Sequence, residues 1–239
     1  MGQIMDSAAD RGVSESSGPK RVLCLHSFRT SGLIMRSQCF DFSNFGSILE
    51  DFGLELSFPD APYKCTSEDE AKIYPMVKQA FGHFGSFYEW FNATDDHPPE
   101  YKRLPATLDF LEKYMVEHGP FDGVVGFSQG GMLAHLIAYL QATGTRFAAI
   151  PRLRFLIVLC ARSSRAAEHE ALWKTPAHSL PRALVIYGGK DQAIKAAETE
   201  ALITTLPDAS TIFLSNQHHA IPRLGQTDTS RLKEFLAAA

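Results

Sequence analysis

The sequence Phe121-Asp-Gly-Val-Val-Gly-Phe-Ser-Gln-Gly-Gly-Met-Leu-Ala-His135 decides the fold of this chain. Its apolar beginning predicts a short buried strand, and the apolar residues that follow at helical spacing predict an amphipathic helix. The turn between them, Gly126-Phe-Ser-Gln-Gly130, matches the pattern Gly-x-Ser-x-Gly. A serine in this pattern stands on a sharp strand-to-helix turn, and the flanking glycines remove side chains that would collide there. We therefore predict that Ser128 is a nucleophile at the end of a strand; the alternative is a structural turn.

Length and charge bound the class of protein. The chain has 239 residues, 45% of them hydrophobic, which is typical of one large α/β domain with a substantial core. The formal net charge is −4 and the basic residues are scattered, which argues against a nucleic-acid partner. No signal peptide or membrane-spanning run is apparent. We expect a disordered leader at 1–19, which is polar and aperiodic, and a single domain at 20–239.

The cysteines favour a reduced protein without a metal. Cys24, Cys39, Cys65 and Cys160 form no Cys-x-x-Cys pair and no Cys/His spacing typical of a metal site. Cys24 and Cys160 lie in apolar, strand-like runs, where a reduced thiol behaves as a small hydrophobic side chain. We therefore expect a reducing compartment, the cytoplasm. The sequence has no glycine-rich phosphate loop and no dinucleotide fingerprint, so we expect no cofactor.

Strands alternate with helices along the chain. Apolar runs predict further strands at residues 21–26, 54–58, 153–160, 182–187 and 211–214. A single helix is expected after the first strand, as far as about Asp51, with Gly53 ending it. The alternation predicts the α/β class, with a mainly parallel sheet that carries helices on both faces.

The stretch 59–99 does not follow this alternation. It is irregular and rich in aromatic residues and proline. A connection this long in a compact α/β domain usually carries function, so we expect a flap that covers a pocket. The alternative is an ordinary hydrophobic flap over one sheet edge. Tyr63 and Trp90 are the candidate substrate-binding residues in this stretch.

Three strand ends carry the residue types of a nucleophilic site. In an open α/β sheet the working groups gather at the C-terminal ends of the strands. Ser128, Asp191 and His219 occupy three such ends, and a serine needs an imidazole base that is in turn oriented by a carboxylate. Asp191 could instead cap a helix. Asp208 is the competing acid and His218 the competing base, both of them less favoured by position.

The reaction also requires two convergent N–H donors for an oxyanion. We expect one from the backbone of Gln129, at the start of the helix, and one from Phe28, in the loop after the first strand. His26 ends that strand, and we expect it to shape the loop through hydrogen bonds rather than to move protons.

These motifs together resemble the family of serine hydrolases named after the yeast proteins, which includes the human ovarian-cancer-associated hydrolase. The matching segments lie between about residues 20 and 222: Leu23-Cys-Leu-His-Ser-Phe-Arg-Thr30, Asp60-Ala-Pro62, Gly126–Gly131, Tyr187-Gly-Gly-Lys-Asp191 and His219-Ala-Ile-Pro222. The resemblance implies an α/β-hydrolase with a six-stranded, mainly parallel sheet and no large separate cap. It also implies hydrolysis of carboxylesters or thioesters and, as in fungal members, release of acyl chains from polyketide synthases. It supports Ser128, Asp191 and His219 as the catalytic residues.

The functional prediction is a serine esterase or thioesterase that cleaves small-molecule esters of apolar acyl chains through an acyl-enzyme. Tyr63 and Trp90 are predicted to line an apolar acyl pocket. Two alternatives remain at this point: a non-catalytic receptor for a small hydrophobic ligand, and an acyltransferase that uses an alcohol or amine instead of water. The oligomeric state stays open.

Overall fold

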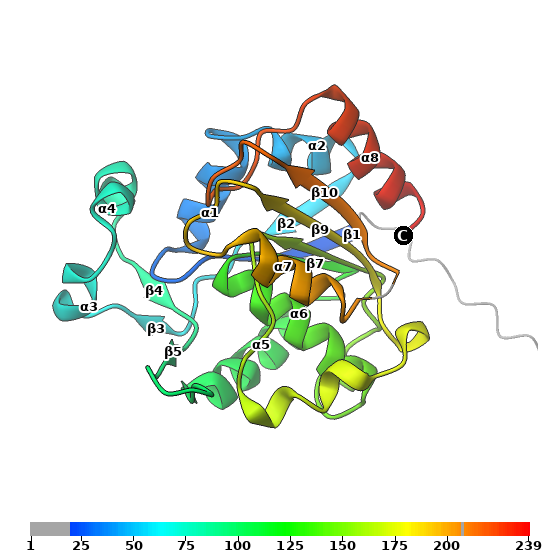
Figure 1. Ribbon diagram of the computed structural model, residues 1–239, viewed down its shortest axis with the longest axis horizontal. Coiled ribbons are helices and arrows are strands. Elements are labelled where there is room, and N and C mark those ends of the chain that lie inside the picture. The colour runs from blue at the N-terminus through cyan, green and yellow to red at the C-terminus, as the bar shows by residue number, and fades with distance from the viewer. Residues whose placement is uncertain (1–19, 207) are drawn as a thin grey trace, which may run out of the picture.

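A computed structural model describes residues 20–206 and 208–239. The predicted disordered leader at 1–19 lies outside these ranges. The centre of the molecule is a six-stranded sheet with the order β10-β9-β8-β7-β1-β2 (Figure 1), in which every neighbouring pair is parallel. Its strands are β1 (Lys20–Leu25), β2 (Leu54–Ser57), β7 (Gly123–Phe127), β8 (Phe155–Leu159), β9 (Arg182–Gly188) and β10 (Ser210–Leu214). The predicted six-stranded α/β architecture is confirmed.

Helices cover both faces of the sheet (Figure 1). Alternate residues of β1 show how: Leu23 and Leu25 belong to one buried apolar cluster, whereas Val22 and Cys24 belong to the other. The first cluster includes residues of α5 (Leu104–His118), α6 (Gln129–Ala142) and α7 (Ala196–Ile203). The second includes residues of α1 (Gly32–Phe40), α2 (Phe45–Asp51) and α8 (Gln226–Ala237). The short 3₁₀ helices η2 (Ala167–His169), η3 (Leu172–Lys174) and η4 (Ala177–Ser179) lie between β8 and β9.

The single helix expected before Gly53 is wrong, because the chain forms α1 and α2 with a break between them. The Ser43 hydroxyl donates to the Cys39 carbonyl at 3.0 Å and accepts from the Phe45 amide at 3.1 Å. The Asn44 side chain exchanges two hydrogen bonds with the backbone of Leu224. The Ser43 hydroxyl thus satisfies backbone groups that a continuous helix would pair internally. The Asn44 contact ties the break to a segment far along the chain.

The stretch 59–99 is more ordered than its sequence suggests. It contains β3 (Tyr63–Lys64), α3 (Ser67–Ala71), α4 (Pro75–Phe81), η1 (Gly82–Phe84), β4 (Tyr88–Glu89) and β5 (Asn92–Ala93). β3 pairs antiparallel with β4, and β5 pairs antiparallel with β6 (Tyr101–Lys102). We call residues 59–99 the flap. A small apolar cluster that includes Phe81 and Phe87 joins the flap to Ile34 of α1.

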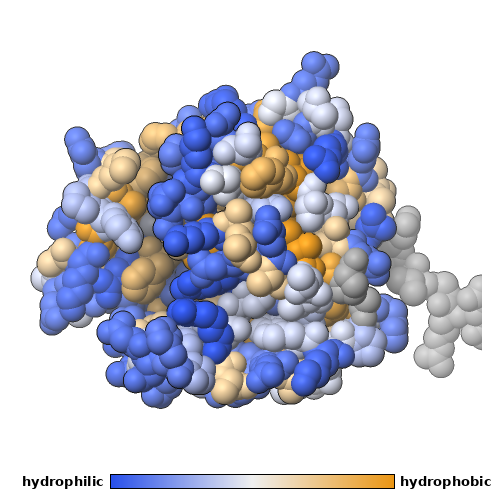
Figure 2. Space-filling model, viewed as in Figure 1, coloured by the Kyte–Doolittle hydropathy of each residue, from blue (hydrophilic) through white to orange (hydrophobic). Residues whose placement is uncertain are grey.

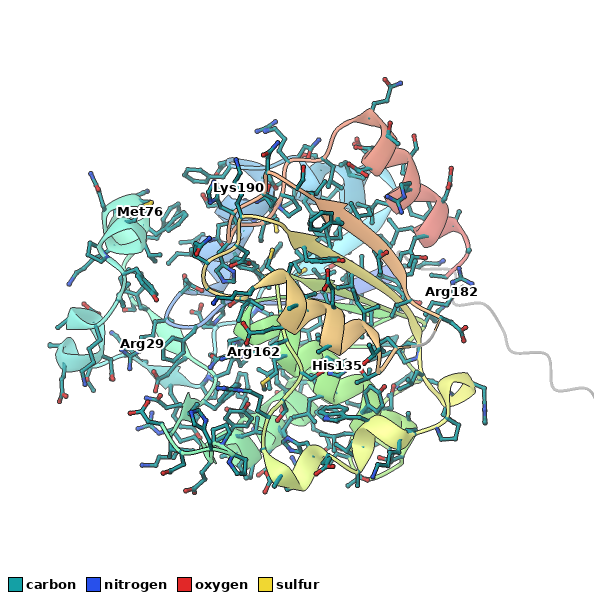
Figure 3. All side chains as sticks on the ribbon, in the orientation of Figure 1. Arg29, Met76, His135, Arg162, Arg182 and Lys190 are labelled. Carbon is teal, nitrogen blue, oxygen red and sulfur yellow. The ribbon has the colours of Figure 1, made fainter. Side chains whose placement is uncertain are left out.

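The flap projects from one side of the molecule, at the left of Figure 1. Figure 2 shows hydrophobic and hydrophilic residues side by side on this projection. Met76, labelled in Figure 3, is 80% exposed on α4. Of the helices in the described ranges, none is both long and apolar enough to cross a membrane.

Candidate active site

Ser128 stands where β7 turns into α6. Its backbone has φ 55° and ψ −112°, outside the regions that L-residues ordinarily adopt. The turn is held from both sides, since the Ser128 amide donates to the Leu159 carbonyl at 2.9 Å and the Met132 amide donates to the Ser128 carbonyl at 3.0 Å. The surrounding sheet thus holds the serine in the strained conformation that the Gly-x-Ser-x-Gly pattern predicts.

The two flanking glycines allow close backbone contacts. A Cβ on Gly126 would lie 2.1 Å from the Gly130 carbonyl oxygen. A Cβ on Gly130 would lie 2.0 Å from the carbonyl oxygen of Leu25, at the end of β1. Gly130 therefore lets the start of α6 press directly against the chain that leaves β1, which is the loop predicted to carry the second oxyanion donor.

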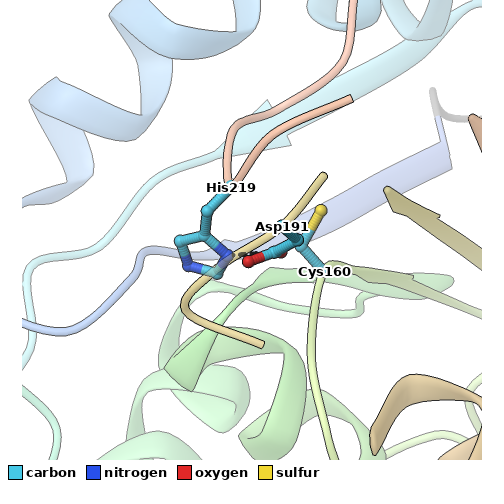
Figure 4. A group of neighbouring side chains, drawn as sticks. All are labelled: Cys160, Asp191 and His219. Carbon is cyan, nitrogen blue, oxygen red and sulfur yellow. Dashed lines mark hydrogen bonds and ion pairs between the residues drawn. The ribbon is translucent and has the colours of Figure 1, made fainter. Parts of the chain in front are cut away.

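The structure brings the three predicted side chains together. The Ser128 Oγ lies 2.9 Å from His219 Nε2, and His219 Nδ1 lies 2.7 Å from Asp191 Oδ2. Figure 4 shows His219 beside Asp191, on the loops that leave β10 and β9. A hydroxyl, an imidazole and a carboxylate in this order form the arrangement in which an imidazole accepts the serine proton.

Asp191 is held as a carboxylate by its hydrogen bonds. It is buried, and its Oδ1 accepts from the amides of Ala193 at 2.9 Å and Ile194 at 2.8 Å. Burial raises the pKa of the Asp191 carboxyl, but the hydrogen bonds from His219 and these amides lower it by more, so the pKa lies below its usual value. Asp191 therefore makes both of the contacts that the sequence suggests. Oδ1 accepts from the backbone amides, as in a helix cap, and Oδ2 contacts His219.

The competing candidates lie elsewhere. Asp208 and His218 are both exposed, whereas the Asp191 side chain is 1% exposed and that of His219 is 24% exposed. The loop after β10 turns only one of its adjacent histidines towards Ser128, and that histidine is His219.

Cys160 lies beside this group, as Figure 4 shows. Ligand atoms of Cys160, Asp191 and His219 lie within 4.8 Å of one another, the only such set of three or more candidate metal donors among the residues described. Burial, together with the negative charge of Asp191, raises the pKa of the Cys160 thiol to about 12. Zinc is bound by the thiolate form of cysteine, and a metal here would also compete with the Asp191–His219 hydrogen bond. These donors fit a hydrogen-bonded relay better than a metal centre.

The loop after β1 contains the other predicted donor. Neither the Phe28 nor the Gln129 amide donates a hydrogen bond to another group in the described part of the chain. Gln129 is the first residue of α6, where backbone N–H groups have no partner within the helix. Arg29, directly after Phe28, has φ 51°, which sets the direction of the neighbouring peptide. Both amides are thus available to a bound group.

His26 organises this loop from inside. Its Nε2 accepts from the Ala61 amide at 3.0 Å, so the proton is on Nδ1, which donates to the Ser27 carbonyl at 2.8 Å. Burial lowers the pKa of His26 to about 4, with the Ser27 hydrogen bond acting weakly in the opposite direction. The imidazole is therefore neutral at physiological pH, and the structural contacts expected for His26 are present.

The two candidate pocket residues differ in their surroundings. Trp90 is completely buried, and its indole N–H donates to the His26 carbonyl at 2.8 Å. It therefore supports the loop from the core, and its role in the acyl pocket stays a prediction. Tyr63 is half-buried, with the Arg103 guanidinium 4.7 Å from its ring centre.

Several residues near the site are not predicted from the sequence. The sequence predicts Cys160 only as a core residue and gives no role to Arg29, Glu89 or the side chain of Gln129. Arg29 and Glu89 pair across 60 positions of the sequence. The signal that could have found Arg29 is a charged residue in the short turn-forming loop that directly follows the apolar first strand.

Comparison with known proteins agrees with this geometry. A family model described as Serine hydrolase (FSH1) matches residues 16–230. The human protein Esterase OVCA2 is 30% identical over 213 residues, which cover 84% of this chain and 88% of that protein. The Aspergillus terreus protein Dihydromonacolin L-[lovastatin nonaketide synthase] thioesterase is 26% identical over 155 residues, covering 61% of this chain and 56% of that protein.

One relative is much longer than this chain. A Schizosaccharomyces pombe protein named Dihydrofolate reductase is 25% identical over 230 residues, which cover 93% of this chain but 48% of that protein. The chain therefore spans about half the length of this relative, and the activity in the name is said of that protein alone.

Solved structures show the same fold. The crystal structure of Zea mays acyl-protein thioesterase 2 has a TM-score of 0.61 and 16% identity, and the match covers 94% of this chain and 95% of that chain. The likeness extends over nearly the whole of both chains, and it shows the α/β-hydrolase fold.

Proposed function

The chain belongs to the serine hydrolase (FSH1) family, and from this premise we propose that it cleaves carboxylesters or thioesters of apolar acyl chains through an acyl-enzyme on Ser128. The observation that carries the proposal is the unbroken series of hydrogen bonds from Ser128 Oγ through His219 to Asp191. Membership of the family supports a hydrolytic enzyme, and the hydrogen bonds support the chemical roles proposed for these three side chains.

In the first half of the reaction Ser128 Oγ attacks the acyl carbonyl carbon. His219 Nε2 takes the hydroxyl proton as the new C–O bond forms, and the carbonyl π electrons move to the oxygen. Asp191 stabilises the resulting imidazolium through the 2.7 Å contact with Nδ1. The oxyanion is bound by the Phe28 and Gln129 amides, which make no other hydrogen bond within the described ranges.

Collapse of this intermediate gives the acyl-enzyme. The C–O or C–S bond to the leaving group breaks, and His219 returns its proton to the departing alcohol or thiol. In the second half a water molecule attacks the acyl carbon, His219 takes the water proton, and the acid is released as Ser128 recovers its hydrogen. No step requires a cofactor.

An apolar acyl group is supported by the surroundings of the site. The Phe28 side chain is 40% exposed on the loop that carries a proposed oxyanion donor. The flap beside it is rich in aromatic residues, and we propose that it covers the bound acyl chain as part of a single domain at 20–239. The printed names of the relatives include an esterase and a thioesterase, so both oxygen and sulfur leaving groups belong in the proposal.

The cytoplasm is the proposed location. All four cysteines, Cys24, Cys39, Cys65 and Cys160, are free and buried, which suits a reducing compartment. Immunofluorescence of the full-length chain checks this.

The experiment that tests the function is hydrolysis of p-nitrophenyl esters and matching acyl thioesters of increasing chain length. We expect turnover that rises with acyl length, and its loss in Ser128→Ala and His219→Ala by several orders of magnitude. His218→Ala is the matched control and should keep wild-type turnover, because His218 is exposed. Absence of turnover in the wild type, or turnover that survives Ser128→Ala, contradicts the proposal. Product formed only with an added alcohol or amine would assign acyl transfer instead.

A further inference from the structure

The flap segment 88–91 lies against both parts of the chain that carry the proposed oxyanion donors. On one side is the loop after β1: the Tyr88 amide donates to the Thr30 carbonyl at 2.7 Å, and the Trp90 indole donates to the His26 carbonyl at 2.8 Å. These two contacts bracket Phe28 in the sequence. The position of the Phe28 amide is therefore fixed by the flap as well as by β1.

On the other side is the start of α6. The Gln129 side-chain oxygen accepts from the Trp90 amide at 3.2 Å, and its nitrogen donates to the Phe91 carbonyl at 2.9 Å. The side chain thus pairs with the flap backbone through both its donor and its acceptor, while its own backbone amide remains free for the oxyanion. Gln129 connects the helix start to the same four-residue segment that holds the loop.

A buried group of charges strengthens the contact with the loop. Arg29 Nε donates to Glu89 Oε2 at 3.1 Å, Nη2 donates to Asp69 Oδ1 at 2.9 Å and Nη1 donates to the Asp69 carbonyl at 2.9 Å. The side chains of Arg29 and Glu89 are 8% and 3% exposed. Arg103 approaches the other oxygen of Glu89 at 3.5 Å, so two cations face two carboxylates. Figure 3 labels Arg29 on the side of the molecule from which the flap projects.

Charges buried in this way fix the loop geometry. Separating Arg29 from Glu89 would leave each buried side chain without its opposite charge, which is unfavourable. Arg29 also has φ 51° and directly follows Phe28, so its side-chain anchors hold the strained backbone next to the proposed donor amide.

We propose that the flap segment 88–91 assembles the oxyanion hole, with Arg29, Glu89 and Gln129 as positioning residues that act through the Phe28 and Gln129 amides. This inference rests on the proposed function, because it gives those amides their role. It assigns to the flap a part in the chemical step, in addition to covering the acyl chain.

The test compares Glu89→Gln and Gln129→Met with Glu68→Gln, the matched control. Glu68 also lies in the flap, but its ion pair with Lys72 is exposed. For each variant, kcat and KM are measured with a p-nitrophenyl ester, Ki with a trifluoromethyl ketone of the same acyl chain, and thermal unfolding in parallel. The ketone forms a hemiketal with a serine nucleophile, and its oxyanion reports directly on the hole.

For Glu89→Gln and Gln129→Met we expect kcat to fall about 10- to 100-fold with KM changed less than about twofold, because donor misplacement affects the transition state rather than ground-state binding. Ki for the ketone should rise by a similar factor. The double variant should lose less than the product of the two single effects, because both residues act through one segment. Glu68→Gln should retain the wild-type values.

Unchanged kcat and Ki in both folded variants, with only a lower melting temperature, would overturn the inference and leave a merely structural contact. If Glu89→Gln does not fold, Gln129→Met decides by the same criteria. Labelling of Ser128 by a fluorophosphonate in the wild type distinguishes failure of the positioning role from failure of the proposed function. Labelling with unchanged variant kinetics removes only the positioning role, whereas absence of both labelling and turnover removes the proposed function and this inference with it.

Discussion

The serine turn and the flap meet at the same site but are held in place by different interactions. The turn is fixed by the sheet: its glycines touch backbone atoms of β1 and α6, and the Ser128 amide is bound to the end of β8. The flap is held by apolar packing, such as that of Phe87 near Ile34, and also by polar contacts between residues distant in sequence, such as Arg29 with Glu89. The proposed nucleophile thus stands on the core sheet, whereas the loop beside it contacts a peripheral segment.

This difference determines how each region responds to substitution. Close backbone packing gives no room for an added atom, so changes at the turn should be severe. Hydrogen bonds and ion pairs contribute about 0.5–3 kcal/mol each, so changes at the flap contacts should be graded.

Asp191→Asn should have the largest effect on activity. The amide removes the charge that stabilises protonated His219, and its NH₂ group can favour the wrong imidazole tautomer. We expect kcat/KM to fall by about 10⁴-fold, measured by ester hydrolysis. Asp208→Asn is the matched control and should be neutral, because Asp208 is exposed. The reverse result would transfer the acid role to Asp208.

Gly130→Ala should destabilise the fold most. Its Cβ would lie 2.0 Å from the Leu25 carbonyl oxygen. Because this oxygen belongs to the backbone, the clash can be removed only if α6 moves away from β1. We expect a loss of more than about 3 kcal/mol in the free energy of unfolding.

The control is Gly82→Ala in the flap. Gly82 has φ −60° and its nearest neighbour to an added Cβ is a lysine side-chain atom at 4.0 Å, so we expect a change within about 0.5 kcal/mol. Equal urea midpoints for the two variants would contradict the contrast between turn and flap.

Acid should destabilise the protein through two buried histidines. Burial lowers the pKa of His26 to about 4 and that of His135 to about 3. The unfolded state, with pKa near 6.5, therefore binds more protons than the folded state as the pH falls below about 6.5. The stability that these neutral histidines contribute is fully present above about pH 6.5. It is lost progressively between about pH 6.5 and 4 for His26, and between about pH 6.5 and 3 for His135.

The expected size is about 3 kcal/mol for His26 alone over this window, measured by urea unfolding between pH 7.5 and 4.5. His26→Gln should flatten the slope in this range by up to about 1.4 kcal/mol per pH unit. An unchanged slope would mean that His26 is not held neutral in the folded state.

Trp90→Phe should have the smallest effect. It removes the indole N–H that donates to the His26 carbonyl and keeps most of the buried ring, so we expect a loss of about 1–2 kcal/mol in stability. Because Trp90 is completely buried, the acyl-length profile in p-nitrophenyl ester hydrolysis should keep its shape. A shifted profile would support the prediction that Trp90 lines the acyl pocket.

The sequence predicts the turn region well because its signals are local. The strand before Ser128, the glycines around it and the alternating strands and helices all follow from neighbouring residues. The positions of Asp191 and His219 follow from the rule that strand ends converge. Spacing in the sequence favours these two residues over Asp208 and His218, but only the structure shows that they reach Ser128.

The flap and the α1–α2 break depend on partners that no local pattern identifies. Asn44 bonds to Leu224, 180 positions away, and Glu89 pairs with Arg29 across 60. The indole of Trp90 donates to the carbonyl of His26, 64 positions away. Contacts of this kind arise from the tertiary arrangement, so the sequence does not predict the proposed positioning residues, whereas it does predict the three side chains that the structure brings together.

The most direct test of the central claim is intact-mass spectrometry after treatment with a fluorophosphonate, followed by peptide mapping. The hydrogen bonds from Ser128 through His219 to Asp191 predict a single adduct on Ser128 in the wild type and in His218→Ala. The same account predicts no adduct in Ser128→Ala and strongly slowed labelling in His219→Ala. An adduct that persists in Ser128→Ala, or labelling that depends on His218 rather than His219, would contradict it.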